Sequence, residues 1–174
     1  RGRARNDPHL KREEKGTKAK ISWDYMYMKE KGAERNKGRP AVVQGEGLPI
    51  IIMKDSESKA IIPTVKPRKG ECEYAITRCA RDVNDILGYK EMIFKSDQES
   101  SLGVALDGIS QLVNGNVVRE RSAVGESQSN GEIEAAVLKV QGLYRTRKSN
   151  LETNYGKYIS AAASLQCSGI LAAV

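Results

Sequence analysis

The fold of this chain is decided by residues 21–28, with the sequence ISWDYMYM. Large apolar side chains occupy every second position, which is the period of a β-strand with one buried face. Asp24 falls on the opposite face, together with Met26 and Met28. A carboxylate among large apolar neighbours is costly to bury unless a partner such as a metal ion compensates its charge. We therefore expect Asp24 to serve a function, and an edge-strand aspartate facing water is the alternative.

Two further strand patterns follow after a long polar segment. Residues 29–47 have no apolar periodicity and are typical of a surface loop. Residues 48–55 and 60–65 are rich in β-branched side chains, which favours two strands joined by a turn. Pro63 places the second of them at a sheet edge, because proline cannot donate to the hydrogen-bond ladder. The first three strands should therefore form an antiparallel meander.

The rest of the chain alternates between helical and strand patterns. The spacing of apolar residues predicts helices over residues 71–87 and 100–113, strands over residues 91–97 and 117–118, and, after a polar loop at residues 125–131, a basic helix to about residue 150. A strand, helix and strand joined by a crossover make a parallel pair. The order β-β-β-α-β-α-β-α thus predicts an α/β fold, with a mixed five-stranded sheet and helices on both faces.

A second and a third acid stand where they could join Asp24. Asp97 ends the fourth strand pattern, and the first and fourth strands are natural neighbours in a sheet of this order. Glu132 and Glu134 open the last helix, and their positions point about 200° apart, so only one of them can face a shared site. Clustered carboxylates repel one another unless cations neutralise them, and Mg²⁺ and Mn²⁺ prefer such oxygen ligands. We expect a site for metal-assisted chemistry on phosphates.

Asp24, Asp97 and residues 128–134 (QSNGEIE) resemble the Asp-Asp-Glu core of retroviral and retrotransposon integrases. In that family the catalytic Glu follows a Gln-Ser-x-Gly loop by three residues, which selects Glu134, although Glu132 also fits the spacing from Asp97. The resemblance implies a ribonuclease H-like fold and a polynucleotidyl transferase. Such an enzyme trims DNA 3′ ends and joins them to target DNA. Asp24, Asp97 and Glu134 would then be the catalytic residues and would hold two Mg²⁺ or Mn²⁺ ions.

The same resemblance suggests which residues meet DNA. The six candidates lie on the loop beside the DNA end and on the helix that takes phosphates: Gln128, Ser129, Asn130, Lys139, Arg145 and Lys148. For the three bases, a solvated helix face is the alternative. The chain differs from the family in two places. After Asp97 it has Gln98-Glu99-Ser100, where many members of the family have Asn-Gly. It departs again at Leu138 and Gln141, where retroviral enzymes present lysines.

Charge and composition agree with a nucleic-acid partner. The 174 residues carry a formal net charge of +7, and residues 1–20, with eight bases and three acids, supply most of it. That segment is either a phosphate-binding arm or a solvated lead-in. No apolar run is long enough for a membrane span, and three cysteines make no disulfide framework. We expect an intracellular protein, nuclear if eukaryotic and not secreted, that acts on DNA as a homo-oligomer without a membrane partner.

Three parts are expected along the chain. Residues 1–20 form a basic arm, which resembles a remnant of the family's upstream zinc-binding module. Residues 21–155 form the integrase catalytic core, and residues 156–174 form a divergent tail. Two other functions remain open. One is a decayed or domesticated remnant that binds nucleic acid without catalysis. The other is a ribonuclease H-like nuclease that cuts RNA–DNA hybrids.

Overall fold

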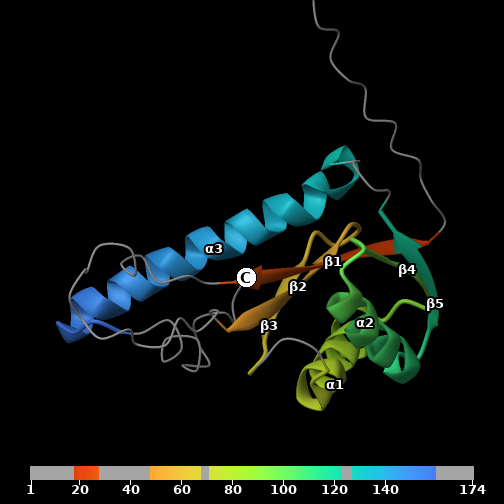
Figure 1. Ribbon diagram of the computed structural model, residues 1–174, viewed down its shortest axis with the longest axis horizontal. Helices are drawn as coiled ribbons and strands as arrows, with labels where there is room; N and C mark the ends of the chain where they lie inside the picture. Colours follow the sequence, from red (N-terminus) through yellow and green to blue (C-terminus); the bar gives the residue numbers. More distant parts are fainter. Residues whose placement is uncertain (1–17, 28–47, 68–70, 123–126, 160–174) are drawn as a thin grey trace, which may run out of the picture.

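The computed structural model describes residues 18–27, 48–67, 71–122 and 127–159 (Figure 1). The predicted element order is confirmed. The elements are β1 (Ala19–Tyr27), β2 (Pro49–Asp55), β3 (Ile61–Val65), α1 (Glu73–Asp82), η1 (Val83–Leu87), β4 (Glu91–Ser96), α2 (Ser100–Leu112), β5 (Asn116–Arg121) and α3 (Ser127–Tyr155). The predicted loop at residues 29–47, nearly all of the basic arm and most of the tail lie outside the described residues.

The five strands form one mixed sheet in the order β3-β2-β1-β4-β5. β1 pairs antiparallel with β2, and β2 pairs antiparallel with β3, which makes the predicted meander. On its other side β1 pairs parallel with β4, and β4 pairs parallel with β5. Pro63 lies in β3 at the edge of the sheet, as the sequence predicts. The mixed α/β architecture is therefore confirmed.

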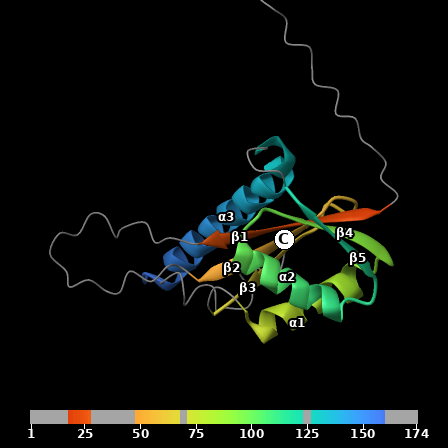
Figure 2. The same cartoon turned by 45° about the vertical axis from the view of Figure 1, so that its right-hand side comes forward.

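Helices cover both faces of the sheet, again as predicted (Figures 1 and 2). On one face α1, η1 and α2 pack on the alternating apolar residues of β1. There Trp23 contacts Phe94 of β4, with ring centroids 5.0 Å apart and the ring planes tilted by 60°. On the other face α3 crosses β1 and β2, and Ile133, Val140 and Tyr144 pack on the sheet. None of the helices in the described ranges is long and apolar enough to cross a membrane.

The helix predicted over residues 71–87 continues beyond α1 as the π-helical turn η1. It ends at Gly88, which adopts the left-handed conformation with φ of 64°. Glycine reaches that conformation without strain, because it has no Cβ, and it is the usual residue at this position after a helix. The predicted end of the helix is confirmed.

Two boundaries differ from the prediction. β5 is longer than residues 117–118, because it pairs with β4 along its whole length from Asn116 to Arg121. The polar loop predicted at residues 125–131 is wrong from Ser127 onward, where the backbone is already helical. A glycine inside a helix costs only about 1 kcal/mol. Burial of Ile133 and Ala136 just beyond Gly131 offsets that cost, so helix extends back through the polar stretch.

Candidate active site

Asp24 and Asp97 become neighbours through the parallel pairing of β1 with β4. Trp23 is the register partner of Ser96, so the next residue along each strand is an acid. Asp24 lies inside β1 and is half-buried, whereas Asp97 follows the last residue of β4 and is exposed. The two carboxylates therefore come from adjacent positions at the carboxyl end of the parallel pair.

Asp24 occupies the sheet face that α3 covers, as its alternation with Trp23 and Tyr25 predicts. Its neighbour on that face, Met26, packs in the cluster formed with α3. The Asp24 Oδ1 accepts a hydrogen bond from the backbone N–H of Tyr25 at 2.7 Å. This bond satisfies one oxygen of a carboxylate that burial makes unfavourable.

The electrostatics of Asp24 show which acids converge on it. Burial is the largest influence and raises the pKa of Asp24 to about 6, against the opposing effect of the Tyr25 N–H. The carboxylates of Asp97, Glu99 and Glu134 raise it further, because like charges disfavour ionisation. Acids from β1, from the segment after β4 and from α3 therefore act on one point.

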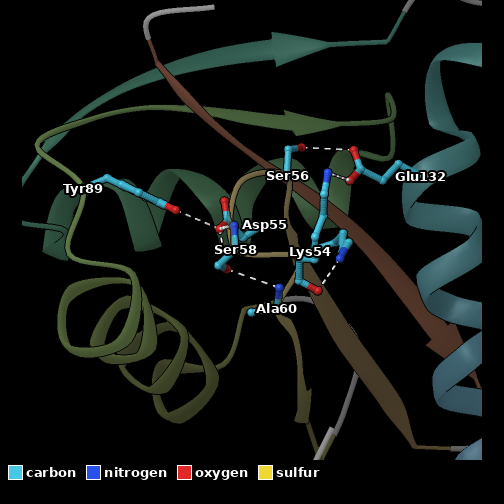
Figure 3. Close-up of polar contacts among 8 residues, drawn as sticks. Lys54, Asp55, Ser56, Ser58, Ala60, Tyr89 and Glu132 are labelled. Atoms are coloured by element: carbon cyan, nitrogen blue, oxygen red, sulfur yellow. Dashed lines mark hydrogen bonds and ion pairs between the residues drawn. The ribbon is translucent and has the colours of Figure 1, made fainter. Parts of the chain in front are cut away.

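Glu132 and Glu134 lie on opposite edges of α3, as helical geometry predicts. The Glu132 carboxylate accepts a hydrogen bond from Ser56 Oγ at 3.0 Å and lies 3.9 Å from Lys59 Nζ (Figure 3). Both partners belong to the turn between β2 and β3. Glu134, in contrast, acts on Asp24. Glu132 thus contacts the turn after β2, whereas Glu134 lies where its charge reaches Asp24.

A short network joins the start of α3 to the strand ends beside Asp97. Ser122, the residue after β5, donates its backbone N–H to the Ser96 carbonyl at 2.9 Å. Its hydroxyl donates to Asn130 Oδ1 at 2.5 Å, and its carbonyl accepts from Gln98 Nε2 at 3.3 Å. Asn130, expected beside DNA, is thereby held against the sheet. Its observed contact positions the helix that carries Glu134.

Glu99 is an acid that the sequence reasoning did not assign to the site. The Asp97 Oδ1 accepts a hydrogen bond from the Glu99 backbone N–H at 3.1 Å, and Ser101 Oγ donates to Glu99 Oε1 at 2.8 Å. These contacts hold the turn that opens α2. The one signal in the sequence was its place two residues after Asp97, where many members of the resembling family carry Asn-Gly. Glu99 is thus a third carboxylate, beside Asp97 and Glu134, whose charge reaches Asp24.

The carboxylate oxygens of these residues are the type of ligand that a hard divalent cation prefers. Mg²⁺ and Mn²⁺ prefer carboxylate oxygens, and the mutual repulsion felt by Asp24 is what a bound cation relieves. Within the residues that the structure describes, however, no three His, Cys, Asp or Glu side chains form a group that could already hold a metal ion. The acids are neighbours and are not a preassembled cage.

The six expected DNA contacts separate on α3. Arg145 is exposed eleven residues after Glu134, which is close to three full helical turns and leaves it on the same edge. Lys139 is exposed seven residues after Glu132 and so lies on the opposite edge. Gln128 and Ser129 begin the helix, but their side chains lie outside the described part of the chain.

Lys148 has local partners at the end of α3. Its Nζ donates to Glu152 Oε1 at 2.6 Å and lies 4.5 Å from the centroid of the Tyr158 ring. Tyr158 reaches it because the chain reverses at Gly156, where φ is 61°. A phosphate would have to compete with Glu152 for this lysine. Arg145 therefore stays the most open base on the Glu134 edge among the expected contacts.

Three solved structures resemble this fold. They are the catalytic core domain of BIV integrase (12% identity, 84% of this chain and 78% of that chain, TM-score 0.49), a chain of the simian T-cell lymphotropic virus intasome in complex with PP2A regulatory subunit B56 gamma (13%, 84% and 45%, 0.53), and the HTLV-2 integrase catalytic core domain in complex with magnesium, in a dimeric form (12%, 84% and 80%, 0.45). No protein-family model and no curated protein matches the sequence.

The fold assignment rests on the intasome chain, whose TM-score is above 0.5. This chain covers less than half of the length of that intasome chain. Sequence identity of 13% extends the likeness to the fold alone. The strand order β3-β2-β1-β4-β5, with helices on both faces, agrees with it. The chain has the fold of a retroviral integrase catalytic core, a ribonuclease H-like mixed sheet.

Proposed function

We propose that this protein is the catalytic domain of a retrotransposon-type integrase, a metal-dependent polynucleotidyl transferase that processes DNA 3′ ends and joins them to target DNA. One observation carries the proposal. The carboxylates of Asp97 and Glu134, from the end of β4 and from α3, both act on the half-buried Asp24 of β1. Paired acids of this kind, on an integrase-like fold, fit phosphoryl transfer assisted by divalent cations.

In this proposal Asp24 and Asp97 share the metal ions and Glu134 holds the second ion. Bound Mg²⁺ or Mn²⁺ would supply activation of the attacking hydroxyl and stabilisation of the leaving oxygen. Asp97 and Glu134 are both exposed, so their side chains are able to turn toward Asp24. Glu99 adds negative charge beside them. The network of Ser122 with Asn130 fixes the backbone from which Glu134 projects.

DNA is the proposed partner, in the form of element ends and target. The net charge of +7 favours a polyanion, and the exposed Arg145 lies on the same helix edge as Glu134. A second copy of the chain is part of the proposal, because joining two DNA ends at one target requires two active sites. This proposed activity would be exerted on chromosomal DNA, hence in the nucleus of a eukaryotic host.

The test is a strand-cleavage and strand-transfer assay with labelled duplex oligonucleotides in Mg²⁺ or Mn²⁺. Asp97→Asn removes one ligand charge and keeps the side-chain shape. It should lower the rate by more than about 100-fold, because loss of outer-shell partners alone costs 10–100-fold in metal sites. Glu132→Gln is the matched control on the same helix and should keep most of the activity.

The alternatives give other results in the same assay. DNA that is bound but neither cut nor joined under either metal would overturn the enzyme proposal and favour a decayed binding protein. Cleavage of RNA–DNA hybrids without joining of DNA ends would favour the nuclease. Loss of activity in Glu132→Gln with retention in Glu134→Gln would overturn the assignment of the third carboxylate.

A further inference from the structure

Two buried polar atoms near the strand ends have no hydrogen-bond partner among the residues that the structure describes. They are the indole Nε1 of Trp23 in β1 and the hydroxyl Oγ of Ser96 in β4. Trp23 is 1% exposed and Ser96 is 3% exposed, so bulk solvent does not reach either side chain. A buried N–H or O–H group without a hydrogen bond costs stability, and nearly all such groups in native proteins bind protein atoms or ordered water.

The two side chains are neighbours on the same face of the sheet. Trp23 and Ser96 are register partners in the parallel pairing of β1 with β4, and adjacent strands lie about 4.8 Å apart. Trp23 packs in the core cluster under α1 and α2 together with Phe94. Ser96 follows Phe94 by two positions, so its hydroxyl lies on that face as well.

The hydrogen-bonding groups of this pair are complementary, but the two atoms do not bond directly. An indole N–H only donates, whereas a serine hydroxyl both donates and accepts. The Trp23 ring packs on Phe94, two residues before Ser96, with ring centroids 5.0 Å apart and the ring planes tilted by 60°. One water molecule between Nε1 and Oγ would accept from the indole and bond to the hydroxyl, which satisfies both groups.

The pair stands where the parallel ladder stops. The register of β1 with β4 ends at Trp23 with Ser96, and the next residue on each strand is a candidate cation ligand, Asp24 or Asp97. The Ser96 carbonyl also accepts the backbone N–H of Ser122 at 2.9 Å, which joins the end of β5 to the same point. The core under α1 and α2 therefore reaches the candidate site at this pair.

We propose that Trp23 Nε1 and Ser96 Oγ hold one buried water between them, and that this bridge fixes the last pair of the parallel ladder and so positions Asp24 beside Asp97. Trp23 and Ser96 are then positioning residues, because they act on the cation only through the two aspartates. The positioning role rests on the proposed function, since it takes the aspartates as cation ligands. The water bridge itself does not depend on that function.

The first test is the fluorescence of the full chain, because Trp23 is its single tryptophan. Ser96→Ala removes one end of the bridge and should shift the emission to shorter wavelength, since the excited indole loses a polar neighbour. The same variant should weaken Mn²⁺ binding in a calorimetric titration by about 10-fold, the lower end of the loss caused by removing outer-shell partners of metal ligands. Ser110→Ala is the matched control. Its hydroxyl donates to the Leu106 carbonyl within α2, so emission and Mn²⁺ binding should stay as in wild type.

Trp23→Phe removes the other end of the bridge and keeps an aromatic ring against Phe94. It should weaken Mn²⁺ binding by a similar factor. Adding Ser96→Ala to Trp23→Phe should cause no further loss, because both substitutions remove the same water. Losses that multiply in the double variant would overturn the bridge, as would unchanged emission in Ser96→Ala alone.

The other outcomes separate the bridge from the proposed function. Emission that shifts in Ser96→Ala while Mn²⁺ binds as tightly as in wild type would overturn the positioning role. A wild type that binds no Mn²⁺, with the emission shift still present, would refute the proposed function and the positioning role and leave the water bridge standing. A crystal structure in which Nε1 or Oγ bonds a protein group in place of water would overturn the water bridge.

Discussion

The two faces of the sheet are built for different tasks. The face under α1 and α2 is closed by apolar side chains from every layer, including Trp23, Met92 and Phe94, which are almost completely buried. The face under α3 has a narrower apolar seam. Asp24 and the acids that act on it lie on one side of the seam, and Glu132 contacts Ser56 and Lys59 on the other. The side chains of β1 contribute to both faces in turn, because each residue that packs under α1 and α2 is followed by one that faces α3.

The face under α1 and α2 mainly stabilises the fold, whereas the face under α3 carries the candidate active site. A helix that lies diagonally over β1 and β2 leaves its two edges open to solvent and to ligands. An acid such as Asp24 is tolerated there at an energetic cost, which suits a site that binds cations. Substitutions on the closed face should therefore act on folding, whereas substitutions on the α3 face should act on charge and binding.

The largest effect is expected at Gly115, which lies between α2 and β5 and packs against Met92 of the closed face. A Cβ at this position would lie 2.6 Å from the Tyr89 carbonyl oxygen and 2.8 Å from Met92 Cε. Backbone atoms cannot move aside cheaply, so Gly115→Ala should lower the free energy of unfolding by about 3 kcal/mol. Urea denaturation measures the change. Gly103→Ala in α2, with no atom within 4 Å, is the control and should not destabilise the protein.

The next effect is expected on the α3 face at Asp24. Its pKa is about 6 in the folded protein and 3.8 in the unfolded chain, so the folded state binds this proton more tightly. The resulting stability is present below pH 3.8 and is lost as the pH rises through 6. In metal-free protein at pH 8, Asp24→Asn should raise the unfolding free energy by about 1–2 kcal/mol, after allowance for solvent screening of this half-buried group.

At pH 4 the same substitution should have almost no effect, because the wild-type carboxyl is then protonated in the folded state. Parallel denaturation curves at the two pH values make the comparison. An identical gain at both would show that charge at Asp24 is not the cause, and a loss of stability at pH 8 would show that the carboxylate is already compensated.

The smallest effect is expected in the middle of α3 at Gly142. This glycine is exposed, and a Cβ there would meet nothing within 4 Å. Gly142→Ala should therefore raise the unfolding free energy by about 1 kcal/mol through helix propensity alone. Thermal unfolding followed by circular dichroism detects it. A loss of stability would mean that the outer face of α3 is covered by another part of the chain or by a second copy.

The fold could be predicted because local patterns and chain order agreed. The alternation predicted both faces of β1 as far as Tyr27, where the described strand ends, and Gly88 marked the end of η1. The placement of Asp97 beside Asp24 followed from the expected parallel pairing of their strands. Helical geometry also separated Glu132 from Glu134, although it could not say which of them faces Asp24.

Other features depended on contacts between distant segments, which no local pattern contains. A polar stretch ending in Gly131 is typical of a loop, yet Ser122 and Asn130 hold it as helix against the strand ends. The contacts of Glu132 with Ser56 and Lys59 join α3 to the turn after β2, so they exist only once the helix has crossed the sheet. Lys148 is paired because the chain reverses at Gly156 and brings Tyr158 back over it.

The central claim, that Asp24, Asp97 and Glu134 form a divalent-cation site on the open face, is tested most directly by calorimetric titration of the full chain with Mn²⁺. Wild type and Glu132→Gln should bind with similar affinity, whereas Asp24→Asn, Asp97→Asn and Glu134→Gln should each lose most of the binding. Ion binding that survives all three substitutions, or that requires Glu132 in place of Glu134, would contradict the account.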